Sequence, residues 1–465
     1  MKVLLTMLLS VILLSFTLPA VCQPVIANKK FSLGSTGRVG FGYSPSLEGR
    51  TGRSLNLRGQ GSIGGRLEQG DYIDLLPALH FTPANAHKDT TDIVFQARLG
   101  LYSGGGQFLA NVNSRSLDGL TVSLPEAFVE ARNIAGTKWS AWAGARYMRH
   151  DDIHINDYFY FDDHSSEGFG VSYKNTSLTA VFPAVMDTSG TPPPYTFVNT
   201  AAGTPARSLR QRTVLIGEQI LPLPGGGSLK LMGEYHRMHK VVKNSDPQYP
   251  GDNGWVLGAK HHTPLSTVKK GSFQDLSARI GTGIANGGDN GDTKTWITYG
   301  APDFSTRKFT GAYSVAVVEH FLLNLSKRFS LNGYGLFTKS RGAAGYQTGK
   351  DYYGKTTFNK KTDIAAGFRS FVYLSDWFHL LNEVHYTLRR DGDDPYASML
   401  KFTVAPTLVP TGERDPWARP HIRAIFSVAH YNRQARDNAY SAFLQQAGNK
   451  SWGTFLGVRC EWWLF

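Results

Sequence analysis

Cysteine is almost absent from this chain. Its 465 residues include two cysteines, Cys22 and Cys460. We expect Cys22 to leave with an N-terminal leader, and the single cysteine that remains excludes an intrachain disulfide. The folded chain must therefore draw its stability from noncovalent interactions.

Long apolar runs are also missing, except at the N-terminus. Beyond that region no segment reaches roughly 18 uninterrupted apolar residues, which excludes a transmembrane helix. The apolar run Val3–Leu18 follows Lys2 and precedes a short stretch of small residues that ends at Cys22. This order is typical of a secretory signal peptide, so we predict a signal over residues 1–22 and one domain over residues 23–465.

A lipoprotein and a membrane anchor are the two alternative interpretations of the N-terminus. In a lipoprotein, Cys22 would be the acylated first residue of the mature chain. Pro19 and Val21 occupy positions where a lipobox prefers leucine and a small residue, so we favour the ordinary signal. A membrane anchor is disfavoured because the apolar run is short and no positive stop-transfer flank follows it.

Positive charge is in excess, but it is not clustered. Lys and Arg number 49 against 36 Asp and Glu, which gives a formal net charge of +13. Without a dense run of Lys and Arg, nucleic acid is not an expected partner. We attribute the excess to loops that contact anionic membrane surfaces, and a channel biased toward anions is the alternative.

Alternation of apolar and polar residues is what the sequence has in abundance. Ser228–His236 and His421–Ala429 each place mostly apolar or small residues on one face and most of their polar residues on the other. A period of two indicates β-strands with two unlike faces. The residues expected on the apolar faces are Leu229, Leu231, Gly233, Tyr235, Ile422, Ala424, Phe426 and Val428.

The C-terminal segment Phe455–Phe465 shows the same period. Arg459 and Glu461 share one parity, and a charge facing lipid at mid-depth costs roughly 2–4 kcal/mol in a membrane barrel. We therefore expect this parity, which includes Trp463, to face the interior. Cys460 falls on the lipid-facing parity and is interpreted as a small apolar residue.

The connections between strand-like segments come in two sizes. Leu223–Ser228 is a tight glycine turn, whereas Asp187–Ser208, Lys240–Gly254 and Asn286–Thr293 are long and polar. Long loops at one end and short turns at the other are typical of outer-membrane barrels. The sequence thus predicts an all-β fold, a transmembrane antiparallel β-barrel surrounded by outer-membrane lipids.

One stretch combines groups that suit carbohydrate binding. Trp142–Phe161 begins as an alternating strand and breaks into a segment crowded with charge, histidine and aromatic residues. Aromatic faces stack on the apolar face of a pyranose, and carboxylates and guanidinium groups hydrogen-bond its hydroxyls.

This stretch closely resembles the third-loop region of the maltoporins, the sugar channels of the bacterial cell outer membrane. Four further blocks resemble the same family and follow its order along the chain: Gly37–Gly42, Gly254–His261, Asp415–Ala424 and Glu461–Trp463. The resemblance implies a barrel of about 18 strands, a third loop folded into the lumen, a homotrimer, and passive passage of sugars or oligosaccharides without a cofactor.

The resemblance also implies the residues of a sugar path. Aromatic residues would form a rail for the sugar, and polar residues beside it would bind hydroxyl groups. Phe273 is placed with an ambiguity of one residue against Ser272. The implied substrate-binding residues are Trp417, Trp463, Phe159, Tyr158, Asp152, Asp157, Arg149, Arg38 and Phe273.

The chain departs from the family pattern at several positions. Two tyrosines of the family fall on Thr36 and Gly64, and an arginine falls on Pro125. The segment 113–120, which aligns with the tryptophan donated by a neighbouring subunit, has no aromatic residue. These departures predict a shortened aromatic rail.

Other functions were considered for the same residues. Asp152, His154 and Asp157 would suit a metal site, with His150, which shares the parity of Asp152 and His154, as a further candidate. Asp152 with Asp157 would also suit a glycosidase pair. No Gly-x-Ser-x-Gly elbow of a hydrolase occurs. Trp417 and Trp463 are alternatively girdle residues at the membrane interface. We predict a nonenzymatic sugar channel without a metal, with a general or anion-preferring porin as the alternative and an outer-membrane enzyme as the second alternative.

Overall fold

The computed structural model describes most of the chain beyond its N-terminus. The predicted signal peptide, Phe465 and residues 113–119 lie outside the described part. The described residues are 26–47, 52–81, 83, 90–103, 120–183, 196–199, 206–209, 211–240, 250–265, 268–287, 294–350 and 356–464.

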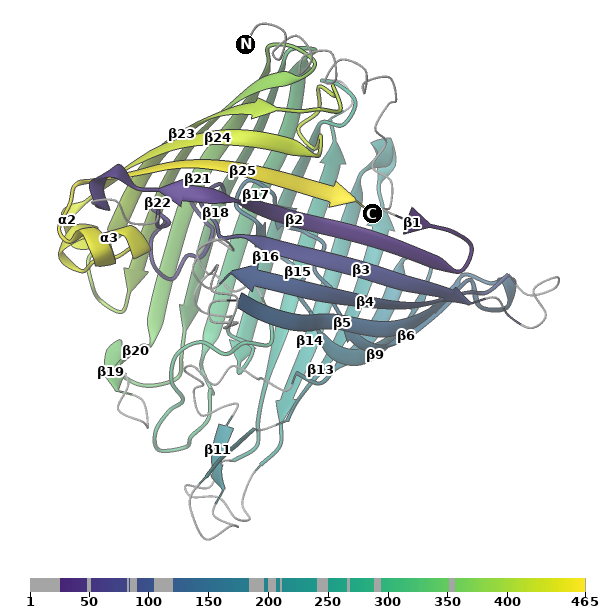
Figure 1. Cartoon of the computed structure of the whole chain (residues 1–465). Helices are drawn as coiled ribbons and strands as arrows, with labels where there is room; N and C mark the ends of the chain where they lie inside the picture. Colours follow the sequence, from purple (N-terminus) through teal and green to yellow (C-terminus); the bar gives the residue numbers. More distant parts are fainter. Residues whose placement is uncertain are drawn as a thin grey trace, which may run out of the picture.

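Eighteen strands form one closed antiparallel barrel in this part of the chain. Each pairs with the next, and the last strand pairs with the first, so that these two strands lie side by side (Figure 1). The strands are β2 (Phe31–Tyr43), β3 (Tyr72–Phe81), β4 (Asp92–Ser103), β5 (Leu120–Arg132), β6 (Trp139–Arg146), β9 (Ser166–Tyr173), β10 (Thr176–Val181), β13 (Arg212–Pro222), β14 (Ser228–Met238), β15 (Asp252–Pro264), β16 (Phe273–Gly283), β17 (Tyr313–Ser326), β18 (Phe329–Arg341), β21 (Lys360–Tyr373), β22 (Phe378–Asp391), β23 (Ala397–Leu408), β24 (His421–Tyr431) and β25 (Trp452–Leu464). The predicted fold class and strand number are confirmed.

Short elements occupy the connections. No helix of the described residues is long and apolar enough to cross a membrane. The short strands are β1 (Ile26–Ala27), β7 (Asp152–Ile153), β8 (Tyr158–Phe159), β11 (Thr196–Asn199), β12 (Ala206–Leu209), β19 (Thr348–Lys350) and β20 (Thr356–Phe358), and the helical turns are η1 (Pro45–Leu47), η3 (Ile134–Gly136), η4 (Pro224–Gly226), α2 (Arg433–Asp437) and α3 (Ala442–Ala447).

The two faces of the strands differ as the alternation predicted. In β25, Leu456 and Val458 are exposed on the outer face, whereas Arg459 and Glu461 are buried inside the barrel. Ile422 and Phe426 of β24 are likewise exposed and Arg423 is buried. The outer face is therefore apolar and suited to lipid, and the charged groups are turned toward the lumen.

The connections also differ in length between the two ends of the barrel. Residues 174–175 and 327–328 are tight turns at one end, and residues 147–165 and 432–451 are long connections at the other. One expected loop is shorter than predicted, because β15 already begins at Asp252, which pairs with Met238 of β14.

Residues 147–165 are the third connection when those at the end with the long connections are counted, and we call them the third connection. They fold into the barrel, as predicted. Ile153 and Ile155 are completely buried, and they pack with Met232, Val256 and Val318 of the strands β14, β15 and β17. This apolar contact holds the loop against one side of the wall, so the open part of the lumen lies on its other side.

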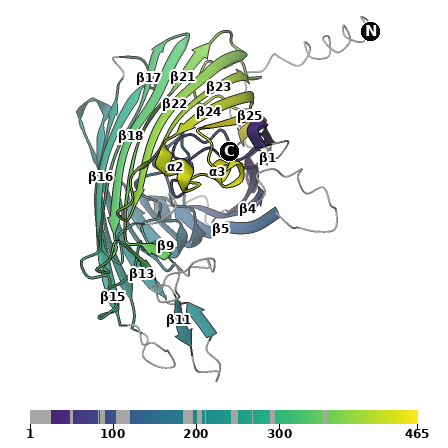
Figure 2. The same cartoon turned by 90° about the vertical axis from the view of Figure 1, so that its left-hand side faces the viewer.

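The first connection joins β2 to β3, and its described residues 52–71 lie in the lumen too, which was not predicted. Leu55 and Leu57 are completely buried and pack with wall residues such as Leu381 and with Phe443 of α3. Burying a leucine contributes about 1.5–3 kcal/mol, so the interior has an apolar core of its own. Figure 2 shows α2 and α3 within the outline of the barrel at the end that carries the long connections.

Candidate functional site

The open side of the third connection borders a cavity of about 830 Å³. Its wall is built from β2, β3, β4 and β25, from the first and third connections, and from the turn between β23 and β24. This candidate cavity brings together seven of the nine residues implied by the resemblance. They are Arg38, Arg149, Asp152, Asp157, Phe159, Trp417 and Trp463.

Two of the implied residues are placed elsewhere. Tyr158 is buried in the apolar packing between the third connection and the wall, because its neighbour Phe159 takes the opposite side of the short strand β8. Phe273 begins β16 and packs against His262 and His320, with ring centroids 6.1 Å and 5.2 Å apart. Neither side chain lines the candidate cavity.

Trp417 and Trp463 reach the cavity from two different elements. Trp463 projects inward from β25, whereas Trp417 lies in the turn before β24. The backbone N–H of Trp417 donates a hydrogen bond to the Asp415 carboxylate at 2.7 Å, which fixes that turn. Trp417 is 37% exposed, so it keeps a free apolar face toward the lumen.

His154 lies between the two tryptophans. Its ring contacts both indoles edge to face, with centroid distances of 4.9 Å to Trp417 and 5.0 Å to Trp463. On Trp463 the guanidinium of Arg419 adds a cation–π contact at 4.1 Å. These contacts hold the two indole rings in fixed orientations.

The hydrogen bonds of His154 define its charge and tautomer. Arg66 Nη2 and Arg419 Nη2 lie 2.9 Å and 3.0 Å from its Nε2. A guanidinium only donates, so Nε2 must accept and the proton resides on Nδ1. Burial and the two arginines hold the pKa of His154 well below its usual range, which keeps the ring neutral.

Two carboxylates from the third connection face the same lumen. Desolvation and the neighbouring charge of Asp157 raise the pKa of Asp152 to about 7. Asp152 Oδ2 lies 3.6 Å from Nδ1 of His154. At neutral pH this carboxyl group can both accept and donate hydrogen bonds, which suits contact with hydroxyl groups.

The arginines of the cavity are held by aromatic rings and by neutral acceptors. Arg149 stacks on Tyr147 and Phe159, at 4.4 Å and 4.3 Å from the ring centroids. Arg38 lies over Tyr72 at 5.2 Å and donates to Gln69 Oε1 at 3.0 Å. Arg38 Nε also donates to the Gly70 carbonyl, so Nη1 is the nitrogen of Arg38 that has no hydrogen-bond partner among the described residues.

Several residues that the sequence analysis did not single out line the cavity as well. Tyr72 and Tyr102 stack at 6.4 Å, and Tyr147 completes a second group of aromatic rings. The alternation of β3 and β4 is the signal that would have placed Tyr72 and Tyr102 on the inner face. The aromatic lining is therefore longer than the departures at Thr36 and Gly64 indicated.

The possible metal ligands do not converge. His150 turns away from Asp152 and His154 and binds Asp162 instead, with its Nδ1 3.2 Å from Oδ2. Residues 147–157 do not form one continuous strand, so these three side chains do not all point to the same side. Across the described ranges, no three His, Cys, Asp or Glu residues are grouped closely enough to hold a metal ion.

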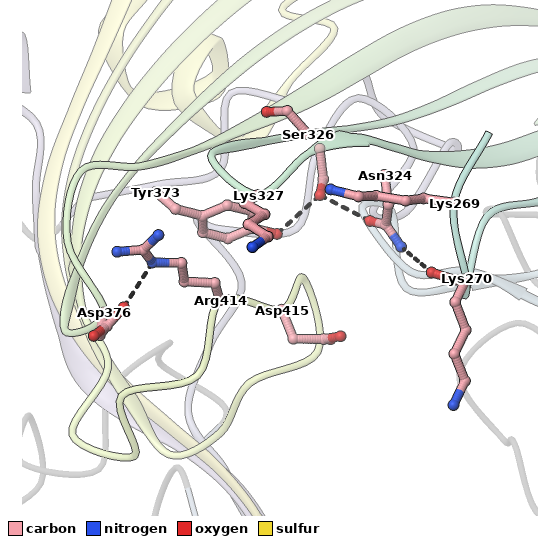
Figure 3. A pocket seen from close by; sticks show the side chains of 10 residues that line it. Lys269, Lys270, Asn324, Ser326, Lys327, Tyr373, Asp376, Arg414 and Asp415 are labelled. Atoms are coloured by element: carbon pink, nitrogen blue, oxygen red, sulfur yellow. Dashed lines mark hydrogen bonds and ion pairs between the residues drawn. The ribbon is translucent and has the colours of Figure 1, made fainter.

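A second cavity, of about 400 Å³, lies at the end of the barrel that carries the short turns. Lys269, Lys327 and Arg414 contribute positive charge to it, and Arg414 pairs with Asp376 at 2.7 Å (Figure 3). It shares no lining residue with the candidate cavity. We call it the turn-end cavity.

Comparisons with solved structures return outer-membrane barrels at low identity. The chain is 12% identical to Pseudomonas aeruginosa OccD3 (OpdP), with 97% of each chain covered and a TM-score of 0.43. It is 11% identical to Salmonella typhi OmpF in complex with daunomycin, with 95% of this chain and 100% of that chain covered and a TM-score of 0.42. It is 10% identical to Wzi, a carbohydrate-binding β-barrel of Escherichia coli, with 92% and 83% covered and a TM-score of 0.41.

A family comparison covers nearly the whole barrel. The model of the LamB porins matches residues 31–463, from the first residue of β2 to the next-to-last residue of β25. The protein belongs to the LamB porin (maltoporin) family and is a channel of the bacterial outer membrane.

Proposed function

We propose that this porin is a passive channel for oligosaccharides. One observation carries the proposal: aromatic faces and hydroxyl-binding side chains, contributed by segments far apart in the sequence, line the same cavity of about 830 Å³. That combination suits a sugar ring, which has an apolar face and a hydroxylated rim.

The proposed passage uses the two kinds of residue together. A sugar ring stacks on Trp417 and Trp463, and its hydroxyl groups exchange hydrogen bonds with Arg38, Asp152 and Asp157. Each contact is weak and the next lies nearby, so the sugar binds well enough to enter and leaves readily. The gradient drives this movement, and no cofactor takes part in it.

The apolar outer face supports a proposed homotrimer. Large side chains such as Phe41, Leu124, Phe169 and Leu178 are exposed on the strands β2, β5, β9 and β10. Lipid tails and neighbouring copies of the chain are the partners that such a surface fits.

The test is single-channel conductance in a planar bilayer. Neutral oligosaccharides of increasing length are added to one side, and the current is recorded at each concentration. We expect saturable block whose affinity increases with chain length until the cavity is spanned. Current that no sugar blocks would contradict the proposal.

A general, anion-preferring porin is the second candidate. The observation in its favour is the number of arginines around the lumen, of which Arg38 and Arg149 form no ion pair with any described residue. Unblocked current with a preference for chloride over potassium would favour this candidate.

A further inference from the structure

We propose that the candidate cavity prefers acidic oligosaccharides, those that carry carboxylate or phosphate groups, over neutral ones of equal length. This inference depends on the proposed function as a sugar channel and names the class of sugar. It comes from the distribution of charge around the cavity rather than from its aromatic lining.

Positive charge exceeds negative charge in and directly behind the wall of the cavity. Arg66, Arg419 and Arg423 all lie near one carboxylate, Glu461, at 2.6, 3.3 and 3.5 Å. One carboxylate balances only one of three guanidinium groups, so this cluster keeps a net positive charge. The other two pairs, Arg98 with Asp74 and Arg459 with Asp71, are balanced.

Arg38 is positioned to receive an anionic group. Its side chain lines the cavity but is only 6% exposed, and no described carboxylate lies within ion-pair distance of it. Its Nη1 has no hydrogen-bond partner among the described residues. A buried donor without a partner is unfavourable, and a carboxylate oxygen of a ligand would satisfy it.

Arg149 offers a second guanidinium next to the aromatic lining. Because its face is stacked on Tyr147 and Phe159, the side chain is held in place. Its N–H edge forms no ion pair with a described residue and can make a bidentate contact with a ligand. A sugar ring on the aromatic rail would thus bring a ring carboxylate close to a fixed guanidinium.

The carboxylates of the third connection reduce this preference without cancelling it. Asp152 and Asp157 line the same cavity. Asp157 lies near Arg38 and Arg149, and Asp152 is partly protonated near neutrality because desolvation raises its pKa to about 7. The lining itself holds four arginines and four aspartates, so the positive excess comes from the partial protonation of Asp152 and from the arginines clustered around Glu461.

The experiment compares a charged sugar with an uncharged one of the same length. Trigalacturonate and its fully methyl-esterified form have the same length and ring structure, and each is titrated against the current of the full-length porin in a planar bilayer. We expect the acid to block at a concentration about tenfold lower than the ester at low salt. Because the difference is electrostatic, it should shrink as salt is raised to about 1 M.

Arginine variants locate the effect. Arg149→Gln and Arg38→Gln should each weaken block by the acid more strongly than block by the ester, and so reduce the preference for the acid. Arg149→Lys keeps the charge and should keep part of the preference. Lys327→Gln removes the charge of an exposed lysine in the turn-end cavity and is the matched control (Figure 3). It should change the blocking concentration of neither the acid nor the ester.

The outcomes separate this inference from the proposed function. Equal block by acid and ester would overturn the preference and leave the sugar channel standing. Block by neither sugar would overturn the proposed function itself. A preference that survives both Arg→Gln changes but disappears in Lys327→Gln would overturn the assignment to this cavity.

Discussion

His154 holds both tryptophans of the candidate cavity in place. It contacts each indole edge to face, and its own position is fixed by hydrogen bonds from Arg66 and Arg419. A neutral histidine suits this role, because a third positive charge beside two arginines would be repelled. His154 and the two arginines therefore hold the tryptophans from behind. In the sequence, His154 was interpreted only as a possible metal ligand.

The first prediction concerns Trp417. Replacing Trp417 with Ala should raise the blocking concentration of a neutral oligosaccharide by roughly two- to tenfold, since it removes one stacking face. Trp139→Ala is the matched control, because Trp139 is 49% exposed on the outer face and packs on Tyr173. Titration of sugar block in planar bilayers measures both, and unchanged block in Trp417→Ala would remove this residue from the sugar path.

The second prediction concerns the charge of Asp152. Its pKa of about 7 means that the carboxyl group loses its proton as the pH rises through neutrality, so the cavity gains a negative charge. We expect the permeability ratio of chloride to potassium to fall between about pH 6 and pH 8. Reversal potentials in a salt gradient measure this ratio. Asp152→Asn should abolish the step, and an equal step in that variant would assign the titration to another group.

At the scale of elements, two connections rather than one narrow the lumen. The inward third connection was predicted through the resemblance, and its apolar residues Ile153 and Ile155 anchor it to the wall. The first connection was not predicted to turn inward. Leu55 and Leu57 alternate with polar residues in a segment that belongs to no barrel strand, so neither periodicity nor composition indicates which surface they bury.

The third prediction tests what holds the first connection in place. Lys401 of β23 is 1% exposed, and its Nζ lies 2.8 Å from Asn56 Oδ1 and 3.2 Å from Glu68 Oε1. Lys401→Met leaves Glu68 buried without this ion pair, a change that costs about 3–5 kcal/mol. We expect the connection to loosen, which would increase the current noise and the open-channel conductance.

A surface lysine is the control for that experiment. Lys327→Met removes the same charge from an exposed turn and should leave noise and conductance unchanged. Limited proteolysis adds a second readout, since cleavage within residues 52–71 should accelerate only in Lys401→Met. Unchanged current noise and unchanged cleavage in Lys401→Met would show that the apolar contacts of Leu55 and Leu57 hold the first connection in place without the ion pair.

At the scale of the whole molecule, the closed ring of strands divides the strand side chains into a set that faces lipid and a set that faces the lumen. β25 pairs with β2, so the closed ring leaves no barrel strand without two neighbours. A closed barrel satisfies its backbone hydrogen bonds within the membrane, so its strands stay paired without a covalent link between them. The free Cys460 lies on the outer face of this last strand, as the alternation predicted.

The fourth prediction tests the outer face at mid-depth. Val458 lies midway along β25 and points outward. Val458→Arg should lower the free energy of unfolding in phospholipid vesicles by about 2–4 kcal/mol, because it places a charge in the hydrocarbon region. Val458→Leu is the control and should have little effect. Denaturant titrations followed by tryptophan fluorescence measure both, and equal stability of the two variants would place Val458 away from lipid.

The sequence by itself determined the fold class, the inner and outer faces of the strands that alternate clearly, and the region of the candidate site. These follow from local patterns: the period of two, the alternation of short and long connections, and the motifs shared with the maltoporins. Such features depend on neighbours along the chain. A shift of one residue in strand register would turn a whole set of charged side chains toward lipid, so the alternation is strongly constrained.

Only the tertiary structure decided which of these residues meet in one cavity. Tyr158 and Phe159 are adjacent in sequence yet face opposite sides of the third connection, and Phe273 lies outside the cavity altogether. Tyr72, Tyr102 and Arg66 join the lining from other strands and loops. Their meeting depends on barrel closure and on how two loops pack inside it, and contacts between residues so far apart in the chain leave no local pattern in the sequence.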